Sequence, residues 1–340
     1  MTALALTALL LLAACDGGGG ETDGQPTATG TAGTDRNTPL PPAGGVEGAN
    51  VTPPALTPGT GEGPEPEGAI VFLSFRDANS EIYSINVDGS GLKNLSNDPG
   101  VDENPDVSPD GKQIVWTSDR GEGGTLHLFV MDVDGSHLRQ LTSGPGGDIS
   151  PRWSPDGKKV AFSRGGSMLV VDAQGGEPEF IFQSDDEATA APCRAGAFPG
   201  GWSPDGVRIA YYSASASRGI GEVCTINADG SGITVVVGEP PVYNVEPAWS
   251  RDGRYLAFRS IRGRNHDVYV FDLETGRERR LTDDPALDLE PSWSPDGEWI
   301  VFGSGRDNEF LDIFIMRKDG SDVRRVTTDP EKESEPVWAP

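Results

Sequence analysis

Short runs of β-branched and aromatic residues, each bounded by turn-forming residues, recur along the chain after about residue 69. Typical runs are Gln113–Ser118, Tyr255–Ser260 and Trp299–Ser304, and each follows Ser-Pro-Asp-Gly or a close variant of it. Runs of this composition predict β-strands, and Pro, Asp and Gly in that order fit a type I turn. The pattern therefore predicts an all-β fold.

The turn motif is evenly spaced. It starts at Ser108, Ser154, Ser203, Ser250 and Ser294, so the copies recur every 44 to 49 residues, with Arg251 in place of Pro in the fourth copy. Each period also holds a third apolar run, such as Ile313–Arg317, and a weaker fourth run in which polar residues indicate an outer edge. Four short strands in a period of this length are typical of a β-propeller blade.

The second strand of the unit occurs six times, starting near Ile70, Gln113, Lys159, Arg208, Tyr255 and Trp299. The first unit lacks the Pro-x-Trp piece that leads the others, and the chain ends on that piece, at Glu335–Pro340. We therefore expect a six-bladed β-propeller of four-stranded blades over residues 69–340. The C-terminal strand is expected to complete blade one and close the ring.

The best copies of the repeat, Pro151–Ser163 and Pro291–Gly320, resemble the repeat of TolB-type (WD40-like) β-propellers. The resemblance supports the fold, and it implies a binding role in the cell envelope, in assembly or transport. Similar repeats also occur in the propeller domains of serine peptidases and in some lyases, so the fold alone does not choose a function. TolB-type proteins carry an α/β domain before the propeller, whereas this chain has a Gly-, Thr- and Pro-rich segment there.

The N-terminus predicts export. Residues 1–15 form an apolar stretch too short to span a bilayer, and Leu12–Cys15 resembles the bacterial lipobox, in which Cys15 becomes lipidated. No Lys or Arg precedes the apolar stretch, and an ordinary signal peptide with a chance Cys remains the alternative. Residues 16–68 predict a disordered tether. We expect an extracytoplasmic protein, in the periplasm or at the cell surface, that contacts the membrane through its lipid only.

The charge narrows the class of partner. The formal net charge is −26, and residues 16–68 carry eight acidic residues and one basic residue. A chain this acidic has no basic footprint for nucleic acid. We expect a monomer whose partner is an envelope protein or peptide.

Two cysteines remain after Cys15. Cys224 occupies a third-strand position that is aromatic in other repeats, and Cys193 lies in the longest insertion between repeats, 184–201. We predict a disulfide between them, because an exported protein folds in an oxidising compartment. Two buried free thiols are the alternative.

Catalytic signals are weak. His127, His137 and His266 fall in separate repeats without metal-ligand spacing, and the sequence has no Gly-x-Ser-x-Gly elbow. We predict no metal, no cofactor and no enzymatic activity. Two alternatives stay open: a sensor or scaffold head that binds a small ligand in the channel, and a carbohydrate-active lyase or hydrolase that uses channel carboxylates.

Polar residues gather where the first strand of each repeat begins and the second ends. These two places share the face opposite the Ser-Pro-Asp-Gly turns, so we expect the acidic group to ring the channel mouth, with the arginines just outside it. One interpretation is a set of Arg–carboxylate pairs that lock neighbouring blades, and the other is capture of a cation, a basic peptide or a polar ligand. The candidate residues are Asp102, Glu103, Asp148, Glu246, Asp288, Glu290, Glu333 and Glu335, with Arg76, Arg120, Arg262 and Arg306.

Overall fold

The computed structural model describes residues 64–184, 192–215, 219–238, 242–307 and 309–339. All described residues belong to one compact unit, Gly59–Pro340. The predicted signal peptide, Cys15 and the predicted tether as far as residue 63 therefore lie outside the described residues. Among the residues that are described, no helix is long and apolar enough to cross a bilayer.

The strands pair in antiparallel fashion with their neighbours along the chain, so that consecutive groups of four form sheets. An eight-stranded sheet consists of two such groups, joined by a single parallel bridge between Gly221 and Tyr243. A 3-10 turn, η2 (Glu122–Gly124), lies between β5 and β6. Two four-stranded sheets come first: one holds β24 (Glu333–Ala339), β1 (Ala69–Ser74), β2 (Glu81–Asn86) and β3 (Lys93–Asn94), and the other holds β4 (Asp102–Val107), β5 (Gln113–Ser118), β6 (His127–Asp132) and β7 (Arg139–Gln140). Two more four-stranded sheets hold β8 (Asp148–Trp153), β9 (Lys159–Arg164), β10 (Ser167–Asp172) and β11 (Glu179–Phe182), and β20 (Asp288–Trp293), β21 (Trp299–Ser304), β22 (Asp312–Arg317) and β23 (Arg324–Arg325). The eight-stranded sheet holds β12 (Phe198–Trp202), β13 (Arg208–Ser215), β14 (Ile220–Asn227) and β15 (Thr234–Val237), together with β16 (Tyr243–Trp249), β17 (Tyr255–Arg262), β18 (Asn265–Asp272) and β19 (Arg277–Arg280).

The last strand lies beside the first. β24 pairs with β1 in a register that sets Ile70 opposite Trp338 and Ser74 opposite Glu333. Two ends of the chain that are far apart in sequence thus share one sheet, and β1 gains a partner on each side, β2 and β24.

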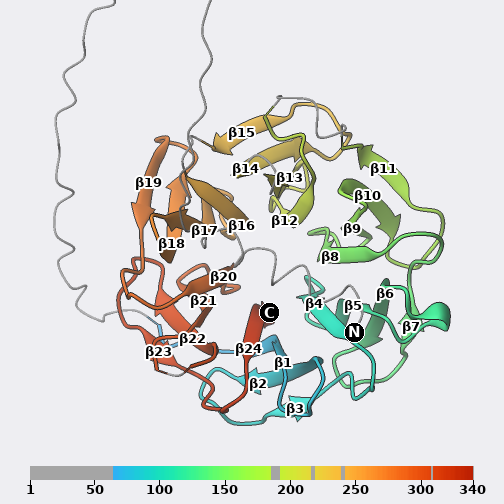
Figure 1. The fold of residues 1–340 in the computed structure, drawn as a ribbon, viewed down its shortest axis with the longest axis horizontal. Helices are drawn as coiled ribbons and strands as arrows, with labels where there is room; N and C mark the ends of the chain where they lie inside the picture. The colour runs from blue at the N-terminus through green and yellow to red at the C-terminus, as the bar shows by residue number, and fades with distance from the viewer. Residues whose placement is uncertain (1–63, 185–191, 216–218, 239–241, 308, 340) are drawn as a thin grey trace, which may run out of the picture. The chain divides into compact units, whose positions relative to one another are not determined.

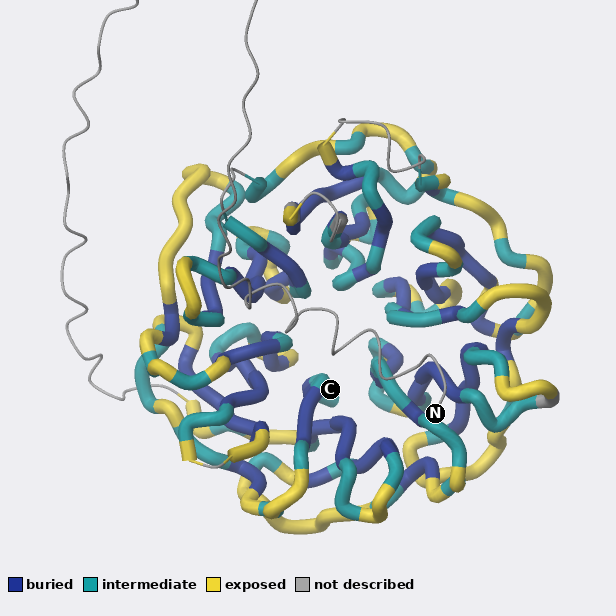
Figure 2. The backbone as a smooth tube through the Cα atoms, in the orientation of Figure 1, coloured by how far each residue is buried: buried dark blue, intermediate teal, exposed yellow. Residues whose placement is uncertain are grey.

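The sheets of the Gly59–Pro340 unit are arranged around a common centre, with β4, β8, β12, β16, β20 and β24 nearest to it (Figure 1). Buried apolar layers join each sheet to its neighbours, and one of them packs Ile70 and Phe72 of β1 against Trp299 of β21. Burial is greatest within the sheets, and exposed residues follow the outer edge (Figure 2). The arrangement is that of an all-β propeller.

The Ser-Pro-Asp-Gly segments form tight turns between the first and second strands. In the first copy, Gly111 N donates to Ser108 O over 2.8 Å and Ser108 Oγ donates to Asp110 Oδ1 over 2.7 Å. Gly111 has φ of 69°, which favours glycine. The Ser108 hydroxyl, together with the backbone amide of Lys112, holds the pKa of Asp110 below its usual value. The same bonds recur in the other copies, so the motif is a structural turn.

The last residues of the predicted tether contact the sheets. Trp299 Nε1 donates to Pro64 O over 3.2 Å, Trp338 Nε1 donates to Glu67 O over 2.9 Å, and Arg324 pairs with Glu65 at 2.7 Å. The fixed part of the chain therefore begins before residue 69.

Candidate functional site

The innermost strands share a backbone irregularity. In five of them the residue before a proline has φ between 54° and 56° although it is not glycine: Asn104, Ser150, Glu246, Glu290 and Glu335. We call these five the central residues. Four of their strands shift register there against the second strand, and β1 shifts against β24 at the corresponding point. A bulge with a left-handed residue bends a strand and re-aims the side chain, at a cost of about 1–3 kcal/mol.

The central residues bond to one another across neighbouring sheets. Glu290 N donates to Glu246 Oε2 over 3.0 Å, and Glu335 N donates to Glu290 Oε2 over 2.6 Å. Both Asn104 N and Asn104 Nδ2 donate to the carboxylate of Glu335, over 2.5 and 3.0 Å. Ser150 N donates to Asn104 Oδ1 over 3.2 Å. Four of the five central side chains, those of Glu246, Glu290, Glu335 and Asn104, thus accept the backbone N–H of the next central residue, and the left-handed backbone presents that N–H.

Burial and mutual repulsion shape the titration of these acids. Burial raises the pKa of Glu335 to about 8, and the negative charges of Glu290 and Glu103 add to the effect. Burial also raises the pKa of Glu103 and of Glu246. A positive charge placed among these groups would reduce the repulsion.

One buried cation partly balances the acids. Arg259 of β17 pairs with Glu246 at 2.8 Å, and its side chain is 9% exposed. It lowers the pKa of Glu246 against the raising effect of burial. Burial, together with the same positive charge, lowers the pKa of the His266 imidazole to about 4. The centre therefore combines four carboxylates with one embedded arginine, and the positive charges of Arg152 and Lys332 also lower the pKa values of acids in this group.

Four of the predicted rim carboxylates lie elsewhere. Asp102, Asp148, Asp288 and Glu333 are 0% exposed, inside the sheets and not at an open channel mouth. Side chains of a propeller strand point alternately at the two neighbouring sheets, so the first residue of an inner strand is covered unless the backbone bends. Burial raises the pKa of Asp102 and of Glu333.

The arginines neutralise these buried acids within one sheet, which corrects the expectation that they lock neighbouring blades. Arg120 pairs with Asp102 at 2.7 Å, Arg306 with Asp288 at 2.9 Å, and Arg76 with Glu333. Arg164, which the sequence interpretation missed, pairs with Asp148 at 2.6 Å. Each arginine ends or follows the second strand of the sheet whose first strand carries the acid, so the pair is local.

Arg262 departs from this scheme. It pairs with Glu278 of β19 at 2.6 Å and stacks on the Tyr269 ring at 4.1 Å. The first-strand position that is acidic in four other sheets is Asn244 here, and its Oδ1 accepts from Ser260 over 2.7 Å. Without a buried acid to neutralise, the arginine turns to the outer strand.

A second set of buried carboxylates went unrecognised in the sequence. Each lies at or near the start of a third strand, directly before its apolar run, and that position is the signal that could have revealed it. Glu81 accepts from Ser96 Oγ over 2.5 Å, Asp267 pairs with Arg280 at 2.9 Å, and Asp312 pairs with Arg325 at 2.7 Å. Their partners lie on or next to the fourth strand, so they attach the outer edge of each sheet.

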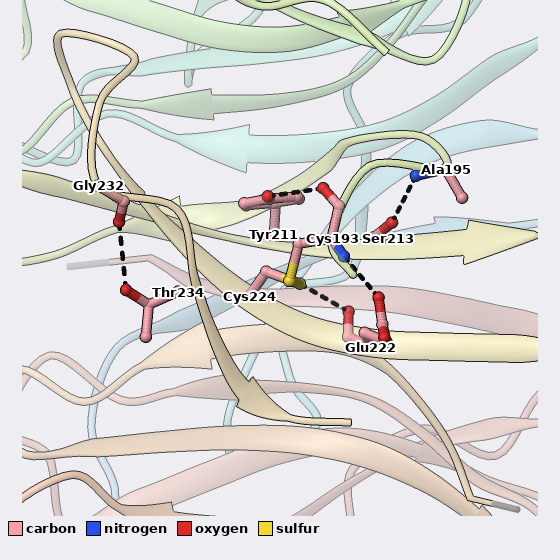
Figure 3. Close-up of a disulfide and its surroundings, with 8 residues drawn as sticks. All are labelled: Cys193, Ala195, Tyr211, Ser213, Glu222, Cys224, Gly232 and Thr234. Carbon is pink, nitrogen blue, oxygen red and sulfur yellow. Dashed lines mark hydrogen bonds between the residues drawn. A yellow bond between two sulfur atoms is a disulfide. The ribbon is translucent and has the colours of Figure 1, made fainter. Parts of the chain in front are cut away.

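The group formed by β12–β15 contains the predicted disulfide. Cys193 and Cys224 are bonded at 2.04 Å, and Glu222 Oε2 accepts from Cys193 N over 2.6 Å (Figure 3). Tyr211 donates its hydroxyl to Cys193 O over 2.9 Å. Among the described residues, these two cysteines and Glu222 are the group of possible metal ligands that lie close together, and the disulfide occupies both sulfurs.

Comparison with known proteins agrees with this architecture. A family model described as the TolB beta propeller domain matches residues 167–340, about half of the chain. The chain therefore belongs to the TolB beta-propeller family. The Tol-Pal system protein TolB of Methylococcus capsulatus is 35% identical over 81 residues, which are 23% of this chain and 19% of that protein. The aligned part is thus less than a fifth of the relative's length.

Solved structures extend the likeness of fold. TolB from Acinetobacter baumannii superposes with a TM-score of 0.68 at 22% identity, over 80% of this chain and 67% of that one. An oligogalacturonate lyase from Vibrio parahaemolyticus superposes with a TM-score of 0.51 at 15% identity, over 75% of this chain and 73% of that one. A fold shared with both a TolB protein and a lyase leaves the function to the site.

Proposed function

We propose that this chain is a non-catalytic binding protein of the cell envelope that presents the centre of its propeller to a protein or peptide. The proposal includes export, lipidation at Cys15 and a tether that reaches to the sheets. The partner carries a positive charge into the centre. The proposal rests most on the gathering of Glu103, Glu246, Glu290 and Glu335, of which Glu246 pairs with the embedded Arg259.

We also infer six blades and a closed ring. The support is the six consecutive groups of four strands, the pairing of β24 with β1, and the apolar layer between β1 and β21. Deleting Glu335–Pro340 removes most of β24, exposes the edge of β1 and is expected to lower the melting temperature and promote association. A deleted chain that stays monomeric and melts unchanged would contradict closure.

The chemistry of the centre favours a cationic group. Several carboxylates with raised pKa values interact there. A lysine or arginine side chain would lower these pKa values, and it would then be attracted to fully ionised carboxylates. The family supports a protein partner, because the curated relative is named as part of the Tol-Pal system. A small cationic ligand would use the same chemistry without a protein interface.

Catalysis by the central acids is less favoured. A lyase or hydrolase needs a carboxylic acid that is free to transfer its proton. Glu335 has the raised pKa of such an acid, but its two carboxylate oxygens each accept an N–H of Asn104. Those bonds assign it to holding the ring and shaping the electrostatic field.

The test is partner capture by the full lipidated chain in its native envelope, with a photo-crosslinker placed near the centre. The variant Glu246→Gln, Glu290→Gln, Glu335→Gln keeps an acceptor oxygen at each position and removes the charge. We expect it to lose the crosslinked partner while its circular dichroism spectrum is retained, although Arg259 loses its ion pair with Glu246. The matched control is Glu177→Gln, Glu309→Gln, Glu331→Gln, at exposed positions. Equal capture of the partner by both variants would contradict the proposal. It would also be contradicted if the wild type cleaved polysaccharide and only the central variant lost that activity.

A further inference from the structure

A cavity that involves none of the central residues lies between the strands β8–β11 and β12–β15. It has a volume of about 560 Å³ and is bounded by the Ser-Pro-Asp-Gly turns of both sheets. Its apolar lining includes Val170, Phe180, Ile181, Trp202 and Pro204.

The cavity exists because one junction between sheets is incompletely filled. The tryptophans that end the other inner strands, Trp153, Trp249, Trp293 and Trp338, are 4–9% exposed, whereas Trp202 is only partly buried. Phe180 of β11 is 58% exposed at the rim. Two partly exposed aromatic side chains thus lie around one cavity. Burial of such side chains by a bound ligand is favourable.

The rim is acidic. Asp156, Asp205, Asp229 and Glu179 line the cavity, against a single cation, Lys159. Hydrogen bonds from Ser154, Ser203 and Ser231 hold the pKa values of the three aspartates below their usual range, so they stay ionised at neutral pH. A ligand that matches this cavity would have an apolar group flanked by positive charges.

The neighbouring strand offers a backbone template. β11 pairs with β10 on one side and is the outermost strand of its sheet. An edge strand can pair with an added extended segment, whose alternate side chains then reach a pocket beside the edge. This favours a peptide over a small cation.

We propose that this cavity, with the edge of β11, binds an extended basic peptide segment that inserts one apolar side chain between Phe180 and Trp202. The chain's own residues 16–63 do not fit, because they hold six acidic residues and one basic residue. The segment therefore belongs to another molecule.

The test uses the mature chain and the rhodamine-labelled peptide Lys-Lys-Thr-Phe-Thr-Lys-Lys, with fluorescence anisotropy as the readout. One twin peptide carries Ala for Phe, and another carries Glu for every Lys. We expect binding of the basic aromatic probe only, weaker at high salt. Phe180→Ser should weaken it about tenfold or more, and Glu179→Lys about threefold or more at low salt.

Matched controls separate this site from the rest of the surface. Phe310→Ser removes an aromatic side chain that is 46% exposed elsewhere, and Glu331→Lys reverses an exposed charge elsewhere, so both should bind as the wild type does. Hydrogen exchange should show protection of the β11 amides by the probe.

Four outcomes overturn the proposal: no binding up to about 1 mM, equal binding of the acidic twin, unchanged affinity of Phe180→Ser, or no protection of β11. Loss of the probe through the central glutamine variant alone would place it in the propeller centre and equally contradict the proposal, without touching the proposed function.

Discussion

The sheet β20–β23 and the group β12–β15 have the same four-strand topology and reach it with different chemistry. In the first, buried Asp288 pairs with Arg306 and Glu290 belongs to the central set. In the second, Ala197 stands five residues before Trp202, as Asp288 does before Trp293, and Pro199 stands where Glu290 would be. The second group therefore lacks both the buried acid and the central carboxylate.

Covalent chemistry replaces the ion pair there. Cys224 takes the third-strand position that is Phe314 in β22, and it bonds to Cys193 of the preceding segment. Glu222 then accepts the N–H of Cys193. The ion pair joins the start of the first strand to the end of the second, whereas the disulfide joins the segment before the first strand to the third strand. The contrast teaches that the same four-strand topology accepts either kind of attachment at the entrance to the sheet.

Removing the disulfide should have the largest effect. Cys193→Ala with Cys224→Ala frees a loop of sequence separation 31, and we expect the free energy of unfolding to fall by about 3–4 kcal/mol. Urea denaturation measures it. Reductant should destabilise the wild type similarly and leave the variant unaffected; equal stability of variant and wild type would show that the bond is dispensable.

Breaking the ion pair of the regular sheet comes next. Arg306→Met leaves Asp288, which is 0% exposed, without its cation, and should cost about 3 kcal/mol. The matched variant Arg262→Met breaks a pair whose side chains are 33% and 37% exposed, and should cost about 1 kcal/mol or less. Similar losses in the two variants would refute the distinction between buried and outer arginines.

Glu335 offers a test by pH. Its pKa is raised from 4.5 to about 8 in the folded protein, so the folded state binds more protons than the unfolded state between these values. This contribution is fully present below about pH 4.5 and is lost as the pH rises towards 8. Glu335→Gln removes the loss, because its amide oxygen can still accept the N–H of Asn104.

The measurement is the free energy of unfolding of variant and wild type from pH 5 to 8. Across this range the free energy of unfolding of the variant should rise relative to that of the wild type by at least about 1.4 kcal/mol, which corresponds to a shift of one pKa unit. The control variant Glu331→Gln, at an exposed position, should show the same pH dependence of the free energy of unfolding as the wild type. A gap that stays constant across this range would mean that Glu335 titrates normally and that the centre is well hydrated.

The strands, turns and disulfide were open to prediction because their chemistry is local. Ser108, Asp110 and Gly111 make their bonds within one turn, and a repeated local signal accumulates along the chain. Cys193 and Cys224 were the remaining pair in a segment expected to be exported.

The split among the acids was not predictable in the same way. Asp288 and Glu290 lie two residues apart and look equivalent in sequence, yet one is fully buried and the other bonds to its neighbours at the centre. The difference comes from the left-handed backbone at Glu290, which the neighbouring sheets hold in place. The altered partner of Arg262 did have a signal, since Asn244 stands where other repeats have an acid.

The smallest expected effect concerns the turn that departs from the motif. Arg251 occupies the second position of a turn whose other copies have proline there, and Gly253 N still donates to Ser250 O over 2.9 Å. Arg251→Pro should therefore raise the free energy of unfolding by about 0.5 kcal/mol, because proline restricts the unfolded chain in a conformation that the turn already requires. Arg251→Ala separates loss of the side chain from gain of the ring, and should be neutral. If proline instead destabilises the protein while alanine does not, the backbone at Arg251 differs from the other four turns, and the repeat is less regular there than its bonds indicate.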